Sequence, residues 1–223
     1  MTGTAIFVKT PGLSPVKSRL AAGLGKAAAE ECHRRCAKAV AAIACSARIG
    51  PVYWAIAEAE GMNHRLWQDL PRLCQPAGGL GARMHQVHEA LLERHGRALL
   101  LGADLPQLTA RALLQAHQWL QDGTKAGVLG PASDGGFWLV GSNCRLPAAT
   151  WNAPRYGHDQ VLREFQEAAD PAISWRHLNE QTDLDDSGDL AAVCAALVGL
   201  ERAHPAQRSL LEWLQSQRTP RIS

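Results

Sequence analysis

Short apolar segments alternate with longer amphipathic ones along this chain. The short segments have strand length and are rich in aliphatic and β-branched residues, whereas the longer ones repeat apolar residues at helical spacing. We expect strands at residues 4–9, 52–57, 98–101, 126–129, 137–140 and 173–178. We expect helices at residues 27–45, 81–94, 109–121, 158–169, 187–197 and 206–217. This alternation predicts an α/β fold, in which a single domain over residues 1–223 has a mostly parallel, twisted sheet with helices on both faces.

Composition narrows the class of protein. The 223 residues are 46% hydrophobic and 20% charged, as in a globular protein, and the net charge of +2 gives no reason to expect nucleic-acid binding. No apolar run has transmembrane length and the N-terminus lacks a signal-peptide pattern, so we expect a cytoplasmic protein that binds no membrane. The six cysteines form no C-x-x-C pair, which predicts reduced packing residues. Nothing in the sequence predicts an oligomeric state.

Two acidic loops follow expected strands. Asp104 comes directly after the apolar run 98–101 in the segment GADLPQLT, and Asp134 lies before two glycines in PASDGGFWLVG. In an open α/β sheet, ligands bind beyond the carboxyl ends of the strands. Loop carboxylates at that position suit a divalent cation, and a cation suits substrates that carry phosphate. Aspartates beside glycine or proline are also common in turns, and for each residue both interpretations stay open.

A basic loop follows the first expected strand. It carries Lys9, Lys17 and Arg19, and it matches neither the Walker loop nor the G-x-G-x-x-G pattern. Backbone amides in such a loop and at a helix N-terminus attract anions, and the basic side chains add contacts to phosphate. We expect Lys17 and Arg19 on an exposed loop. The alternative is a solvated basic loop without a ligand.

Other polar residues are interpreted as structural. The run 33–35 (His-Arg-Arg) is typical of a solvated helix face, and His85 and His88 of surface or groove positions. Asp186 and Asp189 have capping-box spacing for the helix that follows them. Trp138 continues an apolar strand, which favours the core or a pocket wall.

Six motifs across the chain resemble, in the right order, those of predicted bacterial glycosyltransferases of the GT-A, nucleotide-diphospho-sugar transferase superfamily. The family motifs read K-x-P-x-x-G-x-V-K-T-R-L, G-x-R-M, G-T-D-C-P-x-L, P-x-x-D-G-G-Y-W-L-I-G, W-S-T-x-x-V-L and D-x-D-T-P-x-D-L. Here they stand as residues 9–20, GARM (81–84), GADLPQL (102–108), PASDGGFWLVG (131–141), YGHDQVL (156–162) and DLDDSGDL (183–190). The first motif is also similar to the loop of phospholactate guanylyltransferases, and the architecture to that of molybdopterin nucleotidyltransferases.

The resemblance implies a GT-A, Rossmann-like fold and roles for matched residues. Asp104 and Asp185 would hold a divalent cation, Mg or Mn. Nucleotide and phosphate binding would fall to Lys9, Lys17, Arg19, Gly81 and Arg83. The acceptor pocket would include Gly135, Gly136, Tyr156 and His158. Asp134 would orient an acceptor hydroxyl or serve as its general base, with Asp183 as the next candidate for the base.

Three functions remain open. A nucleoside triphosphate can give its nucleotidyl group to a phosphorylated acceptor, or a sugar nucleotide can give its sugar to an acceptor hydroxyl. The third is a non-catalytic nucleotide-binding or interaction protein on the same fold. The basic loop slightly favours a triphosphate over a sugar nucleotide, because three phosphates carry more charge. Ser14 replaces a family glycine and residues 156–158 replace W-S-T, so we expect a working nucleotide site with an altered preference for its small-molecule acceptor.

Overall fold

The computed structural model describes residues 1–123 and 125–218; residue 124 and residues 219–223 of the expected domain lie outside the described part. Seven strands form one sheet in the order β3-β2-β1-β4-β6-β5-β7. The strands are β1 (Gly3–Val8), β2 (Val52–Ile56), β3 (Arg72–Cys74), β4 (Ala98–Gly102), β5 (Ala126–Pro131), β6 (Phe137–Ser142) and β7 (Ser174–His177). Strand β6 runs antiparallel to β4 and β5, and the other neighbouring pairs are parallel. The expected mostly parallel sheet is confirmed.

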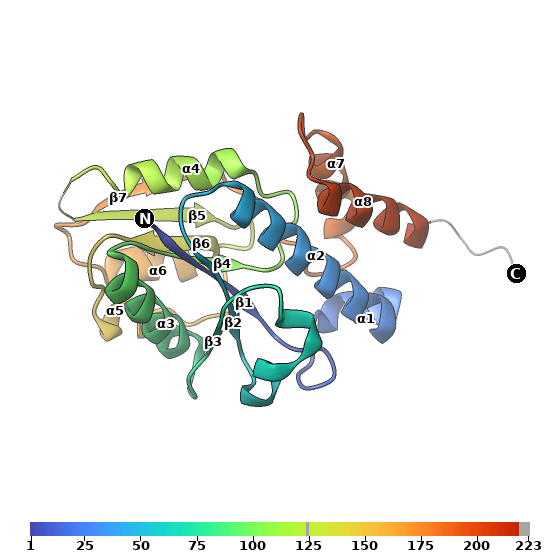
Figure 1. Cartoon of the computed structure of the whole chain (residues 1–223), viewed down its shortest axis with the longest axis horizontal. Helices are drawn as coiled ribbons and strands as arrows, with labels where there is room; N and C mark the ends of the chain where they lie inside the picture. The colour runs from blue at the N-terminus through green and yellow to red at the C-terminus, as the bar shows by residue number, and fades with distance from the viewer. Residues whose placement is uncertain (124, 219–223) are drawn as a thin grey trace, which may run out of the picture.

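Helices cover both faces of this sheet, as expected (Figure 1). The helices are α1 (Ser18–Leu24), α2 (Lys26–Ser46), α3 (Leu80–His95), α4 (Ala110–Trp119), α5 (Ala148–Asn152), α6 (Val161–Glu167), α7 (Asp189–Val198) and α8 (Pro205–Arg218). Helices α2 and α4 pack on the strand residues of one face, where Trp54 and Leu101 are buried. Helices α3, α5 and α6 pack on the other face, against Leu100 and Val140. Alternate strand residues thus enter opposite cores, as the two-residue period of a strand requires.

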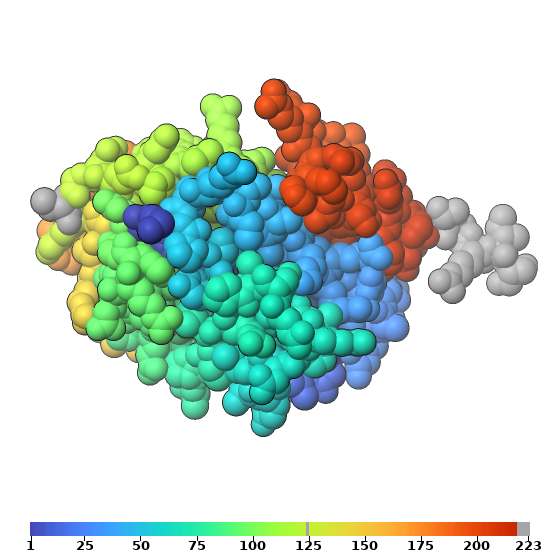
Figure 2. Space-filling model, viewed as in Figure 1, coloured from blue at the N-terminus to red at the C-terminus, as the bar shows by residue number. Residues whose placement is uncertain are grey.

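A third core lies beside the sheet. Helices α1, α2, α7 and α8 contribute Leu20, Cys36, Val193 and Leu210 to it, all fully or nearly fully buried. Figure 2 shows the C-terminal helices lying against the N-terminal part of the chain on this side. One apolar cluster therefore joins α1 and α2 to the C-terminal helices α7 and α8.

Several short elements were not predicted. They are α1, β3, α5 and two 3-10 helices, η1 (Ala59–Asn63) and η2 (Arg65–Trp67). Strand β3 is three residues long and largely exposed at the sheet edge, so it has no apolar run to mark it. The helix expected from residue 158 begins instead at Val161, because the Gln160 amide donates to His158 Nδ1 (3.2 Å) in a preceding turn. None of the helices in the described ranges is long and apolar enough to cross a membrane.

The strand directions gather the polar loops at one edge. Because β1, β4, β5 and β7 run the same way, their carboxyl ends meet there, together with the start of the antiparallel β6. The loops that follow these strands carry Lys17, Asp104, Asp134 and Asp185. The fold therefore brings together four side chains that lie far apart in the sequence.

Candidate functional site

Hydrogen bonds join the loop that carries Asp104 to the loop that carries Asp185. The Leu184 amide donates to the Asp104 carbonyl oxygen (2.9 Å), and the Gln107 side-chain amide donates to the Thr182 carbonyl (2.7 Å). The Asp189 carboxylate accepts from the amides of Asp185 (2.8 Å) and Asp186 (2.9 Å), one half of the expected capping box, while the N-cap residue of α7 is Gly188, which has no side chain to cap it. The position of the Asp185 carboxylate relative to Asp104 is thus set by backbone contacts.

Lys17 lies between the two carboxylates. Its Nζ is 2.6 Å from Asp104 Oδ1 and 3.7 Å from Asp185 Oδ1, and it donates to the Leu184 carbonyl oxygen. The Lys17 side chain is only 2% exposed, so the expectation of an exposed loop position is wrong for this residue. Its backbone takes the left-handed conformation (φ 44°, ψ 49°), which is strained for a non-glycine residue. The cost of this strained backbone is offset because the Lys17 ammonium contacts both the Asp104 and the Asp185 carboxylates.

Charge pairing shifts the pKa values of Lys17 and Asp104 apart. Burial opposes the Lys17 charge, but the carboxylates of Asp104 and Asp185 outweigh it and raise the Lys17 pKa above its usual value. Burial likewise opposes the Asp104 charge, yet Lys17 and then His33 hold the Asp104 pKa well below its usual range. Both residues are therefore charged at neutral pH, as a buried ion pair.

His33 is a site residue that the sequence reasoning missed. It lies on α2, is 5% exposed, and places Nδ1 3.7 Å from Asp104 Oδ1 while Nε2 donates to the Lys9 carbonyl (2.9 Å). The interpretation of residues 33–35 as a solvated face is wrong for His33, whereas Arg34 and Arg35 do pair with Glu31 near the surface. The signal was available: residues 33, 36, 37 and 40 share one helical stripe, and the last three are apolar or small.

Of the remaining carboxylates, Asp185 shares Lys17 with Asp104, and Asp183 has no cation within ion-pair distance among the described residues. Burial, followed by the charges of Asp104, Asp185 and Asp134, raises the pKa of Asp183 to about 8. Burial and Asp104 raise the pKa of Asp185 as well. Among the described residues, Asp183 Oδ1 is buried without a hydrogen-bond partner. The site thus holds more negative charge than Lys17 neutralises.

Asp183→Asn should flatten the fall in stability between pH 5 and pH 8. A carboxyl group whose pKa rises from 3.8 to about 8 on folding costs stability progressively as pH rises through that window, whereas the amide does not ionise. We expect the variant to gain on the order of 2–4 kcal/mol at pH 8. Urea denaturation at each pH, with a chelator present, measures the difference.

Asp186→Asn is the matched control, because the Asp186 carboxylate accepts from the Gly188 amide (2.6 Å) in a local turn. Parallel stability curves for Asp183→Asn and the unmodified protein between pH 5 and pH 8 would contradict the unpaired state of Asp183.

Two pockets adjoin at Asp104. The first, of about 320 Å³, is lined by Asp104, Asp134 and Asp183 together with apolar side chains that include Phe137 and Trp138. The second, of about 200 Å³, has a more basic lining, whose ionisable side chains are those of Lys9, Lys17, His33, Arg83, Asp104 and Asp185. Leu80, the first residue of α3, borders both pockets. The carboxylate of Asp104 therefore faces two chemically different spaces.

The predicted phosphate-binding residues divide between pocket and surface. Lys9 and Arg83 line the second pocket, and Arg83 is oriented by a hydrogen bond to Gln75 Oε1 (3.0 Å). Arg19 is exposed on α1 and lines neither pocket. Ser14, which replaces a family glycine, has no positive φ; Gly12 takes the left-handed conformation of this loop instead (φ 89°).

Gly81 has a packing position. A Cβ at residue 81 would collide with the Trp151 carbonyl oxygen, so glycine lets α3 approach α5 closely, and Gly81 lines neither pocket. Its predicted part in nucleotide binding therefore has no direct contact to support it.

Gly81→Ala should destabilise the protein by about 1–3 kcal/mol, because a methyl group must displace helix backbone. Gly79→Ala is the matched control, since nothing lies within 4 Å of a Cβ there. Thermal or urea unfolding of both variants measures the effect, and equal stabilities would contradict this packing.

Asp134 stabilises a turn through its side chain, which is one of the two roles left open for it. Its Oδ1 accepts from the Gly136 amide (2.9 Å), while the exposed side chain also lines the first pocket. Gly136 lines that pocket too, but Gly135 does not: a Cβ there would collide with the Asp159 backbone, and its φ is 85°. Gly135 therefore belongs to the packing behind the pocket.

Tyr156 and His158, the predicted acceptor residues, both line the first pocket. The Tyr156 hydroxyl donates to the Trp151 carbonyl (2.7 Å), and burial raises the Tyr156 pKa, so it stays protonated. His158 Nε2 lies 3.3 Å from the Glu164 carboxylate. Both rings are thus held in place by neighbours outside the pocket.

The other structural interpretations have mixed outcomes. Trp138 is 3% exposed and contributes to both core and pocket wall, as expected. The surface or groove position expected for His88 is wrong: it is fully buried, and burial lowers its pKa to about 3. Three of the six cysteines, Cys32, Cys36 and Cys194, are buried, in line with the packing role expected for them.

The seven-stranded, mostly parallel sheet with helices on both faces is the α/β, Rossmann-like fold seen in a putative nucleotide-diphospho-sugar transferase. A family model described as "Uncharacterized protein conserved in bacteria (DUF2064)" matches residues 36–158. This span is more than half of the chain, so the protein belongs to the DUF2064 family. It includes Asp104, Asp134 and His158.

Solved structures share the fold. A putative nucleotide-diphospho-sugar transferase from Desulfovibrio desulfuricans G20 aligns with a TM-score of 0.81 at 20% identity, over 97% of this chain and 96% of that one. Rv0371c from Mycobacterium tuberculosis H37Rv aligns with a TM-score of 0.53 at 11% identity, over 86% and 96%. Its homolog from Mycobacterium sp. strain JC1 aligns with a TM-score of 0.54 at 12% identity, over 88% and 97%. No curated protein matches the sequence. At these identities the likeness shows the fold alone.

Proposed function

We propose that this protein is a divalent-cation-dependent transferase. It takes a nucleoside triphosphate or a sugar nucleotide and passes a nucleotidyl or glycosyl group to a small acceptor. The observation that carries the proposal is the placement of Asp104, which borders a basic pocket on one side and an apolar pocket on the other. A donor's phosphates suit the basic pocket, and an acceptor in the apolar pocket would meet them at the acidic edge.

The residues at this edge fit a divalent cation. Asp104 and Asp185 each lie within 4 Å of Lys17 Nζ, and their side chains keep 34% and 47% of their surface exposed. The described residues contain no group of three or more His, Cys, Asp or Glu side chains placed to hold a metal. Mg needs fewer, because it is commonly bound by one or two carboxylates plus waters and substrate phosphates. A bound Mg or Mn ion would neutralise charge on the phosphates.

Lys17 has a different part from the one its motif suggests. Its ammonium is already paired with Asp104 and Asp185, so it holds the acidic loops in place and lowers their repulsion. Lys9 and Arg83 remain as the basic side chains of this pocket that have no carboxylate within ion-pair distance among residues 1–123 and 125–218. The charge available for a triphosphate is therefore smaller than the sequence indicated, and donor binding depends more strongly on the cation.

Two reactions are compatible with this arrangement. In nucleotidyl transfer, an acceptor oxygen bonds to the α-phosphorus as the bond to pyrophosphate breaks, and pyrophosphate leaves with the electron pair. In glycosyl transfer, an acceptor oxygen bonds to the sugar C1 as the C1–O bond breaks, and the nucleoside diphosphate leaves. In the glycosyl reaction the acceptor hydroxyl loses its proton, and Asp134 at the pocket mouth is our candidate to receive it.

Product release tests the proposal. We expect release of pyrophosphate from one of the nucleoside triphosphates, or of nucleoside diphosphate from one of the sugar nucleotides, in the presence of Mg or Mn and an acceptor panel. A chelator should abolish turnover and weaken donor binding, because the unneutralised carboxylates repel phosphate. Donor binding that is independent of metal, without either product, would indicate a non-catalytic nucleotide-binding protein instead.

A further inference from the structure

We infer that the acceptor is a largely apolar molecule that offers a hydroxyl or amino group and carries no anionic group. This inference rests on the proposed function and names the class of molecule that the first pocket accepts. It is drawn from the walls of that pocket, from its charge, and from one buried atom that lacks a partner.

The walls are mostly hydrophobic. Apolar side chains come from four different elements and the α3 N-terminus, and they include Phe7, Leu80, Met84, Leu100, Phe137 and Val161. A cavity of about 320 Å³ with such walls takes a ligand of drug-fragment size, whose burial is driven by its apolar surface. A small sugar phosphate or hydroxy acid has too little apolar surface to use these walls.

The lining of the pocket includes acidic side chains. Asp104, Asp134 and Asp183 line it, and none of its lining residues is Lys or Arg in the part of the chain that the structure describes. Lys17, which lines the neighbouring pocket, pairs with Asp104, so Asp134 is the exposed carboxylate of this lining that has no cation nearby among the described residues. His158 is the one lining side chain able to carry positive charge, and it is already 3.3 Å from the Glu164 carboxylate. An anionic acceptor would face carboxylates without a cation from the pocket to offset them.

Asp183 supplies the polar contact. Its Oδ1 is buried and accepts no hydrogen bond from the described residues, a state that costs free energy until a donor arrives. A hydroxyl or an ammonium group provides that donor, whereas a carboxylate or phosphate does not. The neighbouring basic pocket, with Lys9 and Arg83, is where phosphate groups are favoured. Phosphate thus suits the donor, and the acceptor's nucleophile is a hydroxyl or an amine.

Three molecules with the same ring and similar length test the inference: tyrosol (neutral), tyramine (cationic) and 4-hydroxyphenylacetate (anionic). Titration calorimetry on the full chain, with a chelator so that no cation bridges the anion, gives the three dissociation constants. We expect tyramine to bind at least as tightly as tyrosol, and 4-hydroxyphenylacetate at least about tenfold more weakly than either. Asp134→Asn should narrow the gap between tyramine and the anion by about threefold.

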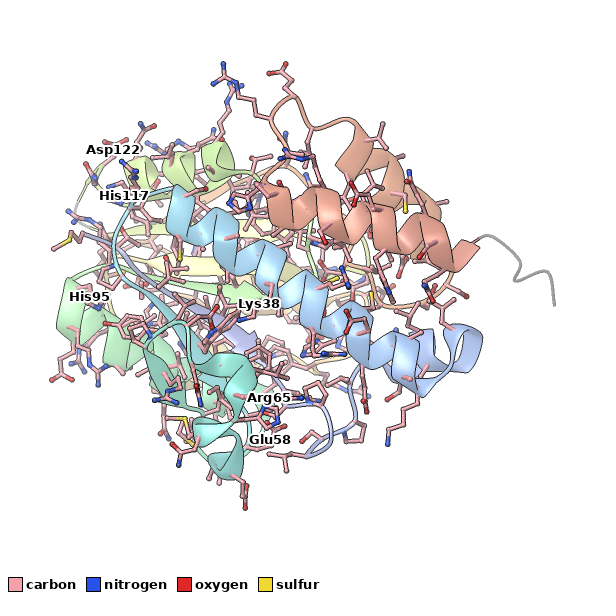
Figure 3. All side chains as sticks on the ribbon, turned by 45° about the vertical axis from the view of Figure 1, so that its right-hand side comes forward. Lys38, Glu58, Arg65, His95, His117 and Asp122 are labelled. Carbon is pink, nitrogen blue, oxygen red and sulfur yellow. The ribbon has the colours of Figure 1, made fainter. Side chains whose placement is uncertain are left out.

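Asp122→Asn is the matched control for Asp134→Asn. Asp122 pairs with Arg176. Figure 3 shows Asp122 beside His117, on the side of the molecule away from Glu58. Glu58 marks the position of the first loop, because its carboxylate accepts from the Thr10 amide. We expect the three dissociation constants to be unchanged in this variant.

Equal or tighter binding of 4-hydroxyphenylacetate would overturn the inference, and so would absence of binding by all three molecules. Product release from donors with an anionic acceptor would overturn it while leaving the proposed function intact. Selective binding of tyramine and tyrosol without any product from any donor would support the pocket's selectivity and overturn the proposed function.

Discussion

Lys17→Met should destabilise the protein by about 2–3 kcal/mol at neutral pH. The methionine keeps most of the side-chain length but leaves Asp104, which lies 2.6 Å from Nζ, without its positive partner. Removing one member of a buried ion pair costs about 3–5 kcal/mol, and we expect less because Asp104 remains 34% exposed. Urea denaturation of the two proteins measures the loss.

The metal gives this prediction a second readout. Millimolar Mg should restore part of the lost stability of Lys17→Met, because the added cation compensates the same carboxylates. Arg19→Met is the control, since Arg19 is exposed and should change stability by no more than about 0.5 kcal/mol. A stability of Lys17→Met equal to that of Arg19→Met would contradict the central place of Lys17.

Asp185→Asn should lower turnover by a factor of about 100 or more while raising stability in the absence of metal. The loss follows because a carboxylate that holds the cation contributes several kcal/mol to the transition state. The gain follows because burial and Asp104 raise the Asp185 pKa, which means that its charge is disfavoured in the folded protein at neutral pH. Product-release kinetics and chelated urea denaturation measure the two effects.

Asp186→Asn separates a metal-binding role from general loop chemistry. Asp186 directly follows Asp185 in the chain, but its carboxylate accepts a hydrogen bond from the Gly188 amide, and Asp186 lines neither pocket. We expect its turnover to stay within about threefold of the unmodified protein, because no reacting group contacts it. Similar losses of turnover in both variants would show that the loss comes from a disturbed loop. Unchanged turnover in Asp185→Asn would contradict the assignment of Asp185 to the cation site.

Local patterns were sufficient for the sheet and for the acidic edge. Segments such as 98–101 are apolar and short, and an aspartate directly after such a strand is predicted at the carboxyl end of the sheet, where Asp104 lies. Long-range contacts were not predictable in the same way. Lys17 meets Leu184, 167 positions away, and nothing in its own loop marks a lysine as buried. Burial of His33 depends equally on where α2 packs beside the loops after β1 and β4, which carry Lys9 and Asp104.

Glycine roles illustrate a second limit. A motif match assigns Gly81 and Gly135 to ligand binding, because glycine permits close approach of a substrate. In the structure the close approach is made by the protein itself, through the Trp151 carbonyl at Gly81 and the Asp159 backbone at Gly135. Sequence shows that something lies near such a residue, but only the tertiary arrangement shows what.

The peptide hydrogen bond from Leu184 to Asp104 has a consequence for redesign of this edge. Since this main-chain bond and the Gln107 contact to the Thr182 carbonyl join the two loops independently of the carboxylates, the reach of the acidic side chains can be varied while these bonds are kept. Lengthening a ligand by one methylene, as in Asp185→Glu, alters the opening between the carboxylates without dismantling the loops. The edge therefore offers an engineer a scaffold for selecting among cations of different radius by changing one residue at a time.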